Sequence, residues 1–310
     1  MLDRAIVQKY ESFEFVVNQL VEGFMTGLHK SPFHGFSVEF AEHKTYNSGD
    51  SIKHIDWKLY ARTDKLFVKS YEEETNLRCY LLVDVSSSMY YPVLDNPTVN
   101  EPDKITFSCY SAACIANLLQ RQRDAVGLSL FSEDIKLFTP VRSSYQHLQY
   151  LYTQLEKLIT NNKTERTKAK KSNLAESLDL LAEKIHKRSL IIIFSDMFDN
   201  YSDKEKLFSA LQHLKYNNNE VVLFNVSDYD KEFEFEFPEK PTRFIDIETK
   251  TELKVNPNLI KKEFSKLQNN FLQEIIHKCQ QYRIDFINAD INKGYDNIML
   301  SFLKKRQKLH

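Results

Sequence analysis

The chain has 310 residues, of which 42% are hydrophobic and 27% are charged, so it can form a packed core and wholesale disorder is excluded. Its 42 basic and 43 acidic residues nearly balance, which excludes a global electrostatic attraction to nucleic acid or to an anionic membrane. The N-terminus lacks the apolar segment of a signal peptide, and no stretch approaches the ~18 apolar residues of a membrane span. The four cysteines show no C-x-x-C spacing, as expected of reduced thiols. We therefore predict a cytoplasmic protein.

Residues 1–75 are predicted to form an N-terminal helix and a small α+β module packed on the rest of the chain. Apolar residues recur at helical spacing over residues 1–30. The segments FSVEF and KLFVKSY alternate like short strands, and SIKHIDWKLYAR between them is typical of a helix that Asp50 or Ser51 can cap. Because so small a core is not stable alone, a fragment of residues 1–75 is expected to lack cooperative unfolding.

From residue 76 onward, strand-like and helix-like segments alternate. The nearly continuous apolar run LRCYLLVD is typical of a strand buried on both faces of a parallel sheet. Further strands are predicted at AVGLSLFS, DIKLFTP, RSLIIIFSD, NEVVLFNVSD and RIDFINA, with helices between most of them. This alternation predicts an α/β fold with a doubly wound, mostly parallel sheet over 76–310. A β-hairpin insert is predicted near 231–254, beginning with the alternating strand FEFEF at 233–237.

Polar residues follow two of the predicted strands. Asp84 ends the first, and Ser86 and Ser88 come directly after it, two residues apart, so that both hydroxyls can face the same way. Asp196 ends a later strand. Ligands bind beyond the carboxyl ends of parallel strands, and carboxylate and hydroxyl oxygens suit Mg²⁺, Mn²⁺ or Ca²⁺. A polar loop with a serine helix cap would explain the first segment about equally well.

The segment DVSSSM resembles the D-x-S-x-S motif of the metal-ion-dependent adhesion site of von Willebrand factor type A domains, and FSD resembles the second acidic motif of that family. The family places a threonine between them, just before a helix; Ser172 stands there in this chain, and Thr164 or Thr167 in the same loop could replace it. The resemblance implies a von Willebrand factor type A-like fold. It also implies a Mg²⁺ site, with Mn²⁺ or Ca²⁺ as alternatives, formed by Asp84, Ser86, Ser88, Ser172 and Asp196.

A block before the first buried strand narrows the resemblance. The segment YNSGDSIKHIDWKLYAR is similar to the Y-x-x-G-D-x-x-x-x-I-D-W-x-x-x-A-R block of the bacterial domain-of-unknown-function 58 family. Its residues are expected to be structural, with a turn at the glycine and the tryptophan anchoring the small module on the sheet domain. The expected structural residues are Tyr46, Gly49, Asp50, Asp56, Trp57 and Arg62. The resemblance implies a non-enzymatic adaptor that works with a MoxR-type AAA+ ATPase.

Residues beside the predicted metal site are candidates for contact with a protein partner. The candidates are Tyr90, Tyr91, Lys168, Lys170 and Lys171. Basic residues around the site would favour an acidic partner, although a solvated loop is the usual role of such a charge run.

Three functional hypotheses remain open. The first is a cation-dependent protein-binding module, the second a metal-free structural adaptor with a degenerate site, and the third a metal-dependent hydrolase. The sequence has no nucleotide-binding glycine motif, no nucleophile elbow and no histidine in the right loops to act as a general base. The sequence therefore predicts that the chain is not an enzyme.

Overall fold

The computed structural model describes residues 12–29, 43–45, 57–69, 77–160, 173–197, 204–245, 251–296 and 299. The chain divides into a larger unit, Met1–Thr26 with Leu77–His310, and a smaller unit, Gly27–Asn76. Among the described residues, no helix has both the length and the apolar character needed to cross a membrane.

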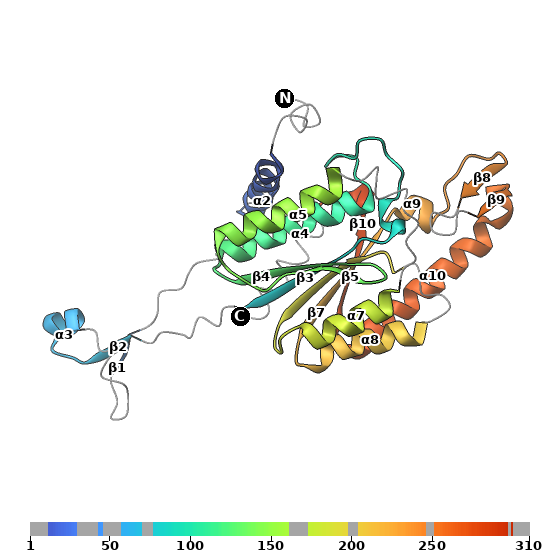
Figure 1. Cartoon of the computed structure of the whole chain (residues 1–310). Helices are drawn as coiled ribbons and strands as arrows, with labels where there is room; N and C mark the ends of the chain where they lie inside the picture. The colour runs from blue at the N-terminus through green and yellow to red at the C-terminus, as the bar shows by residue number, and fades with distance from the viewer. Residues whose placement is uncertain are drawn as a thin grey trace. The chain divides into compact units, whose positions relative to one another are not determined.

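The larger unit is built on a six-stranded sheet with the order β10-β7-β6-β3-β4-β5 (Figure 1). Its strands are β3 (Arg78–Asp84), β4 (Ala125–Phe131), β5 (Ile135–Phe138), β6 (Leu190–Ser195), β7 (Glu220–Ser227) and β10 (Asp285–Asp290). Every neighbouring pair is parallel except β4 and β5. Strands β3 and β6 are buried along nearly their whole length, which is why their sequences are continuous apolar runs. The predicted α/β fold with a mostly parallel sheet is confirmed.

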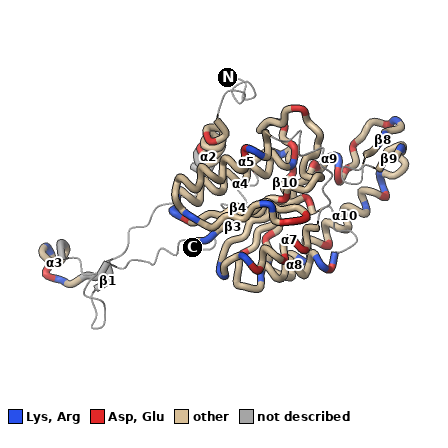
Figure 2. Tube along the Cα trace, in the orientation of Figure 1, with Lys and Arg blue, Asp and Glu red and all other residues tan. Residues whose placement is uncertain are grey.

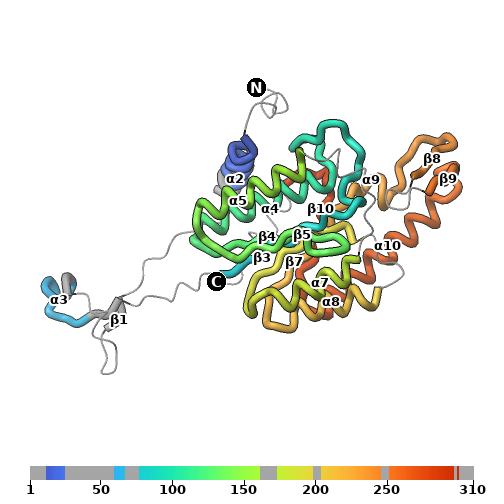
Figure 3. The backbone as a smooth tube through the Cα atoms, viewed as in Figure 1, coloured from blue at the N-terminus to red at the C-terminus, as the bar shows by residue number. Residues whose placement is uncertain are grey.

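Helices cover both faces of this sheet (Figures 1 and 3). One face carries α4 (Lys104–Arg121) and α5 (Tyr145–Thr160), and the other carries α7 (Leu174–Lys184), α8 (Lys204–Tyr216) and α10 (Pro257–Tyr282). Three short helical segments join strands to the next elements, namely η2 (Ser87–Tyr90), α9 (Tyr229–Glu232) and η4 (Ile291–Lys293). Lysine, arginine and acidic residues are interspersed over these elements (Figure 2).

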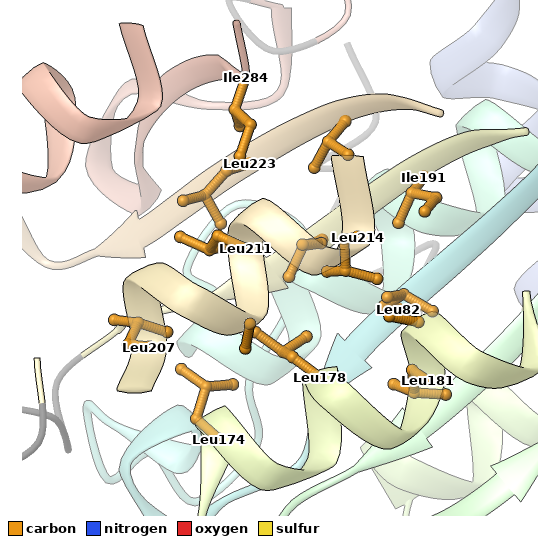
Figure 4. Packing of buried hydrophobic residues seen from close by; sticks show 14 of the residues in the cluster. Leu82, Leu174, Leu178, Leu181, Ile191, Leu207, Leu211, Leu214, Leu223 and Ile284 are labelled. Carbon is orange, nitrogen blue, oxygen red and sulfur yellow. The ribbon is translucent and has the colours of Figure 1, made fainter. Parts of the chain in front are cut away.

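Leucines spaced at one helical face bring α7 and α8 together against the sheet (Figure 4). The contributing leucines, each at most 1% exposed, are Leu174, Leu178 and Leu181 of α7 and Leu207, Leu211 and Leu214 of α8. They pack with Leu82, Ile191 and Leu223 of the strands. Each fully buried leucine contributes about 1.5–3 kcal/mol, so this apolar layer contributes much of the stability of the sheet domain.

Helix α2 (Phe13–His29) packs with the larger unit through its buried residues. The ring of Phe13 stacks on Tyr110 of α4 with centroids 4.8 Å apart, and Val17 and Val21 are fully buried. The chain up to Thr26, which includes most of this predicted N-terminal helix, thus belongs to the larger unit.

The smaller unit contains a two-stranded antiparallel sheet of β1 (His43–Thr45) and β2 (Phe67–Lys69), with α3 (Trp57–Thr63) between them in sequence. Strand β2 lies within the predicted KLFVKSY segment, and α3 covers the second half of the predicted helix and extends one residue beyond it, to Thr63. The predicted strand FSVEF and residues Tyr46, Gly49, Asp50 and Asp56 lie outside the described residues. Trp57 begins α3, and Arg62 is exposed in its last turn.

An antiparallel hairpin of β8 (Thr242–Ile245) and β9 (Glu252–Val255) occupies part of the predicted insert. The prediction that FEFEF forms one of its strands is wrong. Phe235 has a φ of 50°, which breaks an extended conformation, and its ring packs on Phe244 and Phe264 at centroid distances of 5.6 and 4.6 Å. Phe235 and Phe237 thus pack on Phe244 of the hairpin instead of forming one of its strands.

Candidate functional site

The carboxyl ends of β3 and β6 lie side by side and bring together residues that are distant in sequence. Val83 of β3 is in register with Phe194 of β6, so Asp84 and Ser195 follow at the same edge of the sheet. The Ser195 hydroxyl donates to Asp84 Oδ2 at 2.7 Å. Asp84 is 1% exposed and Asp196 is 7% exposed. This edge, with Asp84, Ser86, Ser88 and Asp196, is called the crevice below.

The turn after β3 is organised by Asp84. The backbone N–H of Ser86 donates to Asp84 Oδ1 at 2.8 Å, and the hydroxyl oxygens of Ser86 and Ser88 lie 3.1 Å apart. Ser86 occupies the position before η2, but its side chain makes no capping hydrogen bond, so capping does not explain the serine there. Ser86 is buried, whereas Ser88 is partly exposed and can be reached from solvent.

The spacing of these two hydroxyls fits a divalent cation. Octahedral Mg²⁺ holds its oxygens at about 2.0–2.1 Å, so two neighbouring ligands lie about 2.9 Å apart. The observed 3.1 Å between Ser86 Oγ and Ser88 Oγ suits such a pair as well as the hydrogen bond that joins the two hydroxyls. Within the described part of the chain, no group of three or more His, Cys, Asp or Glu side chains could hold a metal ion. A cation in the crevice would therefore depend on these serine oxygens.

Lys104 is a site residue that our sequence analysis missed. It begins α4, is 1% exposed, and its ammonium lies 2.7 Å from Asp196 Oδ2 and 2.6 Å from Glu232 Oε1 of α9. The available signal was a lysine at the start of a helix that carries no other charge before Arg121 in its last turn. A cation is unfavourable at a helix N-terminus, which implies that carboxylates compensate for it.

The electrostatics of the crevice show an excess of negative charge. Burial raises the pKa of Asp84 to about 6, and the charge of Asp196 adds to this, while hydrogen bonds from Ser195 and Ser86 oppose it. Burial likewise raises the pKa of Glu232 to about 7, against the lowering effect of Lys104. Burial alone would lower the pKa of Lys104, but Asp196 and Glu232 outweigh it and hold that pKa above its ordinary value. The Lys104 ammonium thus pairs with Asp196 and Glu232, while Asp84 lies beside the charge of Asp196.

The two tyrosines predicted to contact a partner differ in their exposure to solvent. Tyr90 is 2% exposed, so its ring is not on the surface. Tyr91 is half-buried, its carbonyl accepts from the Lys104 backbone N–H at 2.9 Å, and its ring lies 5.9 Å from the Lys104 ammonium. Burial and the charges of Asp228 and Glu232 raise the pKa of Tyr91 to about 12, so this tyrosine stays a neutral hydrogen-bonding group at physiological pH.

Part of the predicted site falls outside the described residues. Lys168, Lys170, Lys171 and Ser172 lie there. The helix α7 begins two residues after Ser172, and Asn173 at the capping position makes no side-chain capping hydrogen bond.

Residues 42–271 of the chain match the family described as "Protein of unknown function DUF58". The chain belongs to this family. Among curated proteins, uncharacterized proteins of Mycobacterium tuberculosis and Mycobacterium bovis are each 24% identical over 194 residues, which is 63% of this chain and 58% of theirs. The match thus spans less than two thirds of the length of these relatives.

Solved structures give weaker likenesses. The conserved hypothetical protein BatB of Bacteroides thetaiotaomicron aligns with a TM-score of 0.45 and 11% identity, covering 75% of this chain and 99% of that one. An aerotolerance-related membrane protein of Bacteroides fragilis aligns with a TM-score of 0.43 and 14% identity, covering 74% and 99%. Likenesses at these TM-scores carry no argument about the function of this DUF58 protein.

Proposed function

We propose that the chain is a non-enzymatic protein-binding module with a von Willebrand factor type A-like domain, and that its crevice holds a divalent cation. The observation that carries the proposal is the pair of hydroxyl oxygens of Ser86 and Ser88, 3.1 Å apart, directly after the buried Asp84. The negative excess around Asp84 supports it, because a buried carboxylate needs a compensating positive charge. Mg²⁺ is the first choice, and Mn²⁺ or Ca²⁺ would suit the same hard oxygens.

In this proposal the residues of the crevice have different tasks. Ser86 and Ser88 offer their hydroxyl oxygens directly. Both oxygens of Asp84 already accept hydrogen bonds, from the Ser86 N–H and the Ser195 hydroxyl, so Asp84 orients the serine turn and supplies negative charge. Ser172 is proposed as a further oxygen. The bound cation would offer an open coordination position to an acidic side chain of a partner protein.

The partner we propose is a MoxR-type AAA+ ATPase or its client, on the strength of the family resemblance. Tyr91, Lys168, Lys170 and Lys171 would contribute to the rim of the docking surface, where basic residues favour an acidic partner and speed its association. Tyr90 is left out because its ring is buried.

A metal-free adaptor is the second candidate, and Lys104 favours it. The ammonium already lies on Asp196 and Glu232 at 2.7 and 2.6 Å, so part of the charge compensation is built into the chain. The two candidates differ in whether a divalent cation binds at all, and this can be measured.

Calorimetric titration with Mg²⁺ and Mn²⁺ tests the proposal. Ser88→Ala removes one proposed oxygen at a partly exposed position, and we expect it to weaken binding by about tenfold or more, since few protein oxygens hold the ion. Ser111→Ala is the matched control, because it removes a buried hydroxyl of α4 that has no hydrogen-bond partner among the described residues. This variant should bind like the wild type. Negligible heats in all three chains would refute the cation and leave the metal-free adaptor.

The protein-binding half of the proposal is tested by affinity capture from the native cytosol. The same captured partner should be lost with EDTA and lost with Ser88→Ala, while Ser111→Ala retains it in Mg²⁺. A partner retained under every condition would show that docking does not use the cation.

A further inference from the structure

Lys104 is held from two sides in the interior of the larger unit. Its ammonium contacts Asp196 after β6 and Glu232 of α9, and the three side chains are 1%, 3% and 11% exposed. Burying an ammonium is costly unless it is paired and hydrogen-bonded. The two carboxylates provide that pairing, so the ammonium is confined between them.

Hydrogen bonds also hold the backbone of Lys104 and the carboxylate of its partner Glu232. Its backbone N–H donates to the Tyr91 carbonyl at 2.9 Å, and the helix that it begins is capped by Asp103, whose carboxylate accepts from the Thr106 N–H at 2.9 Å. On the other side, Glu232 Oε2 accepts from the Asp228 N–H at 3.0 Å. Moving the ammonium away would therefore leave two oriented carboxylates buried without their cation.

We propose that the Lys104 ammonium supplies the positive charge that Asp196 requires. The ion pair keeps this carboxylate from acting as a ligand of a divalent ion. This role rests on the proposed function, which supplies the divalent ion. The carboxylates then fall into two groups: Asp84 orients the serine turn, while Asp196 and Glu232 pair with Lys104. A divalent ion next to Asp196 Oδ2 would repel the ammonium that lies 2.7 Å from the same oxygen.

A charge-matched pair of substitutions can separate this proposal from a general effect of charge. When all three carboxyls are ionised, Asp84, Asp196 and Glu232 outnumber the single lysine of the wild type by two negative charges. The double variant Lys104→Met with Glu232→Gln leaves Asp84 and Asp196, which is the same excess. Any gain in cation affinity then shows that the Asp196 carboxylate has become available as a ligand.

We expect the double variant to bind Mn²⁺ about tenfold more tightly than the wild type in calorimetry, because one carboxylate ligand is added. Adding Asp196→Asn to the double variant should remove the gain. In the otherwise wild-type chain, Asp196→Asn should change the affinity by no more than about twofold, since Lys104 already holds this carboxylate. A double variant that binds no more tightly than the wild type overturns the proposal, as does a tenfold loss in the single variant.

The outcomes distinguish this inference from the proposed function. Binding by the double variant alone supports the role of Lys104 and refutes cation binding by the wild type. Equal binding by both supports the proposed function and refutes the role of Lys104, and no binding by either refutes both. If the double variant does not fold, the ammonium ¹⁵N resonance of Lys104 in the wild type decides: slow exchange that persists in saturating Mg²⁺ supports the proposal, and its absence or loss overturns it.

Discussion

At the scale of single residues, the ion pairs of Lys104 contribute more to the stability of the crevice than its single hydrogen bonds do. The Ser195 hydroxyl on Asp84, at 2.7 Å, is a bond whose loss costs about 1–3 kcal/mol when it leaves a buried acceptor unsatisfied. Removing Lys104 alone would strand two carboxylates, and breaking a buried ion pair in this way costs about 3–5 kcal/mol. The lysine is therefore the residue on which the stability of this edge depends most, and a single Lys104 substitution is a poorer test than the charge-matched pair.

His147 provides a prediction about pH. It is 9% exposed in α5, and its Nε2 lies 3.0 Å from the Val126 carbonyl oxygen. Burial lowers the pKa of His147 below its ordinary value of 6.5; the Val126 hydrogen bond raises it, the charge of Arg142 lowers it further, and the net shift is downward. Between the lowered pKa and 6.5 the unfolded chain binds more protons than the folded one, so stability is lost as the pH falls through this window.

We expect His147→Gln, which keeps an amide donor for Val126, to lack this part of the pH dependence. Urea midpoints of both chains at about pH 7.5 and about pH 5.5 check it. The wild type should lose more stability between the two pH values than the variant does. Equal losses would show that His147 does not contribute.

At the scale of elements, the start of α4 positions the crevice lysine and offers a capping prediction. Asp103 is fully buried and its carboxylate accepts from the Thr106 N–H at 2.9 Å. Asp103→Ala should lower the free energy of unfolding by about 1–2 kcal/mol, whereas Asp103→Asn, which can still cap, should cost clearly less. Urea unfolding measures both. Two variants of equal stability would show that the cap does not support this helix.

The elements were predictable where one local pattern decided them. The apolar runs of β3 and β6 and the leucine spacing of α7 and α8 follow from burial on both faces of the strands and on one face of the helices. The strand predicted for FEFEF was wrong because a period of two also fits phenylalanines that pack from an irregular segment. The positive φ of Phe235, which breaks the extended conformation, has no signal in the sequence.

The candidate site divides in the same way. The serine turn after β3 was predictable because Asp84, Ser86 and Ser88 are close in sequence. The pairing of Lys104 with Asp196 and Glu232 was not, because the partners are 92 and 128 residues away. The fold brings these charges together by placing the start of α4 and the short helix α9 beside the end of β6. A local sequence pattern does not predict this pairing.

At the scale of the whole molecule, helix α2 is separated from the sheet by the smaller unit in sequence, yet it packs with the larger one. Val17 and Val21 are fully buried, and Phe13 stacks on Tyr110. Each fully buried apolar side chain contributes about 1.5–3 kcal/mol, so losing α2 should cost on the order of several kcal/mol. A chain that starts at Leu77 should therefore unfold at a lower urea midpoint than the full chain. As the matched comparison, a chain in which residues 27–76 are replaced by a flexible Gly/Ser linker retains α2 and should keep most of the stability. If the linker chain were no more stable than the chain that starts at Leu77, α2 would contribute nothing to the sheet domain.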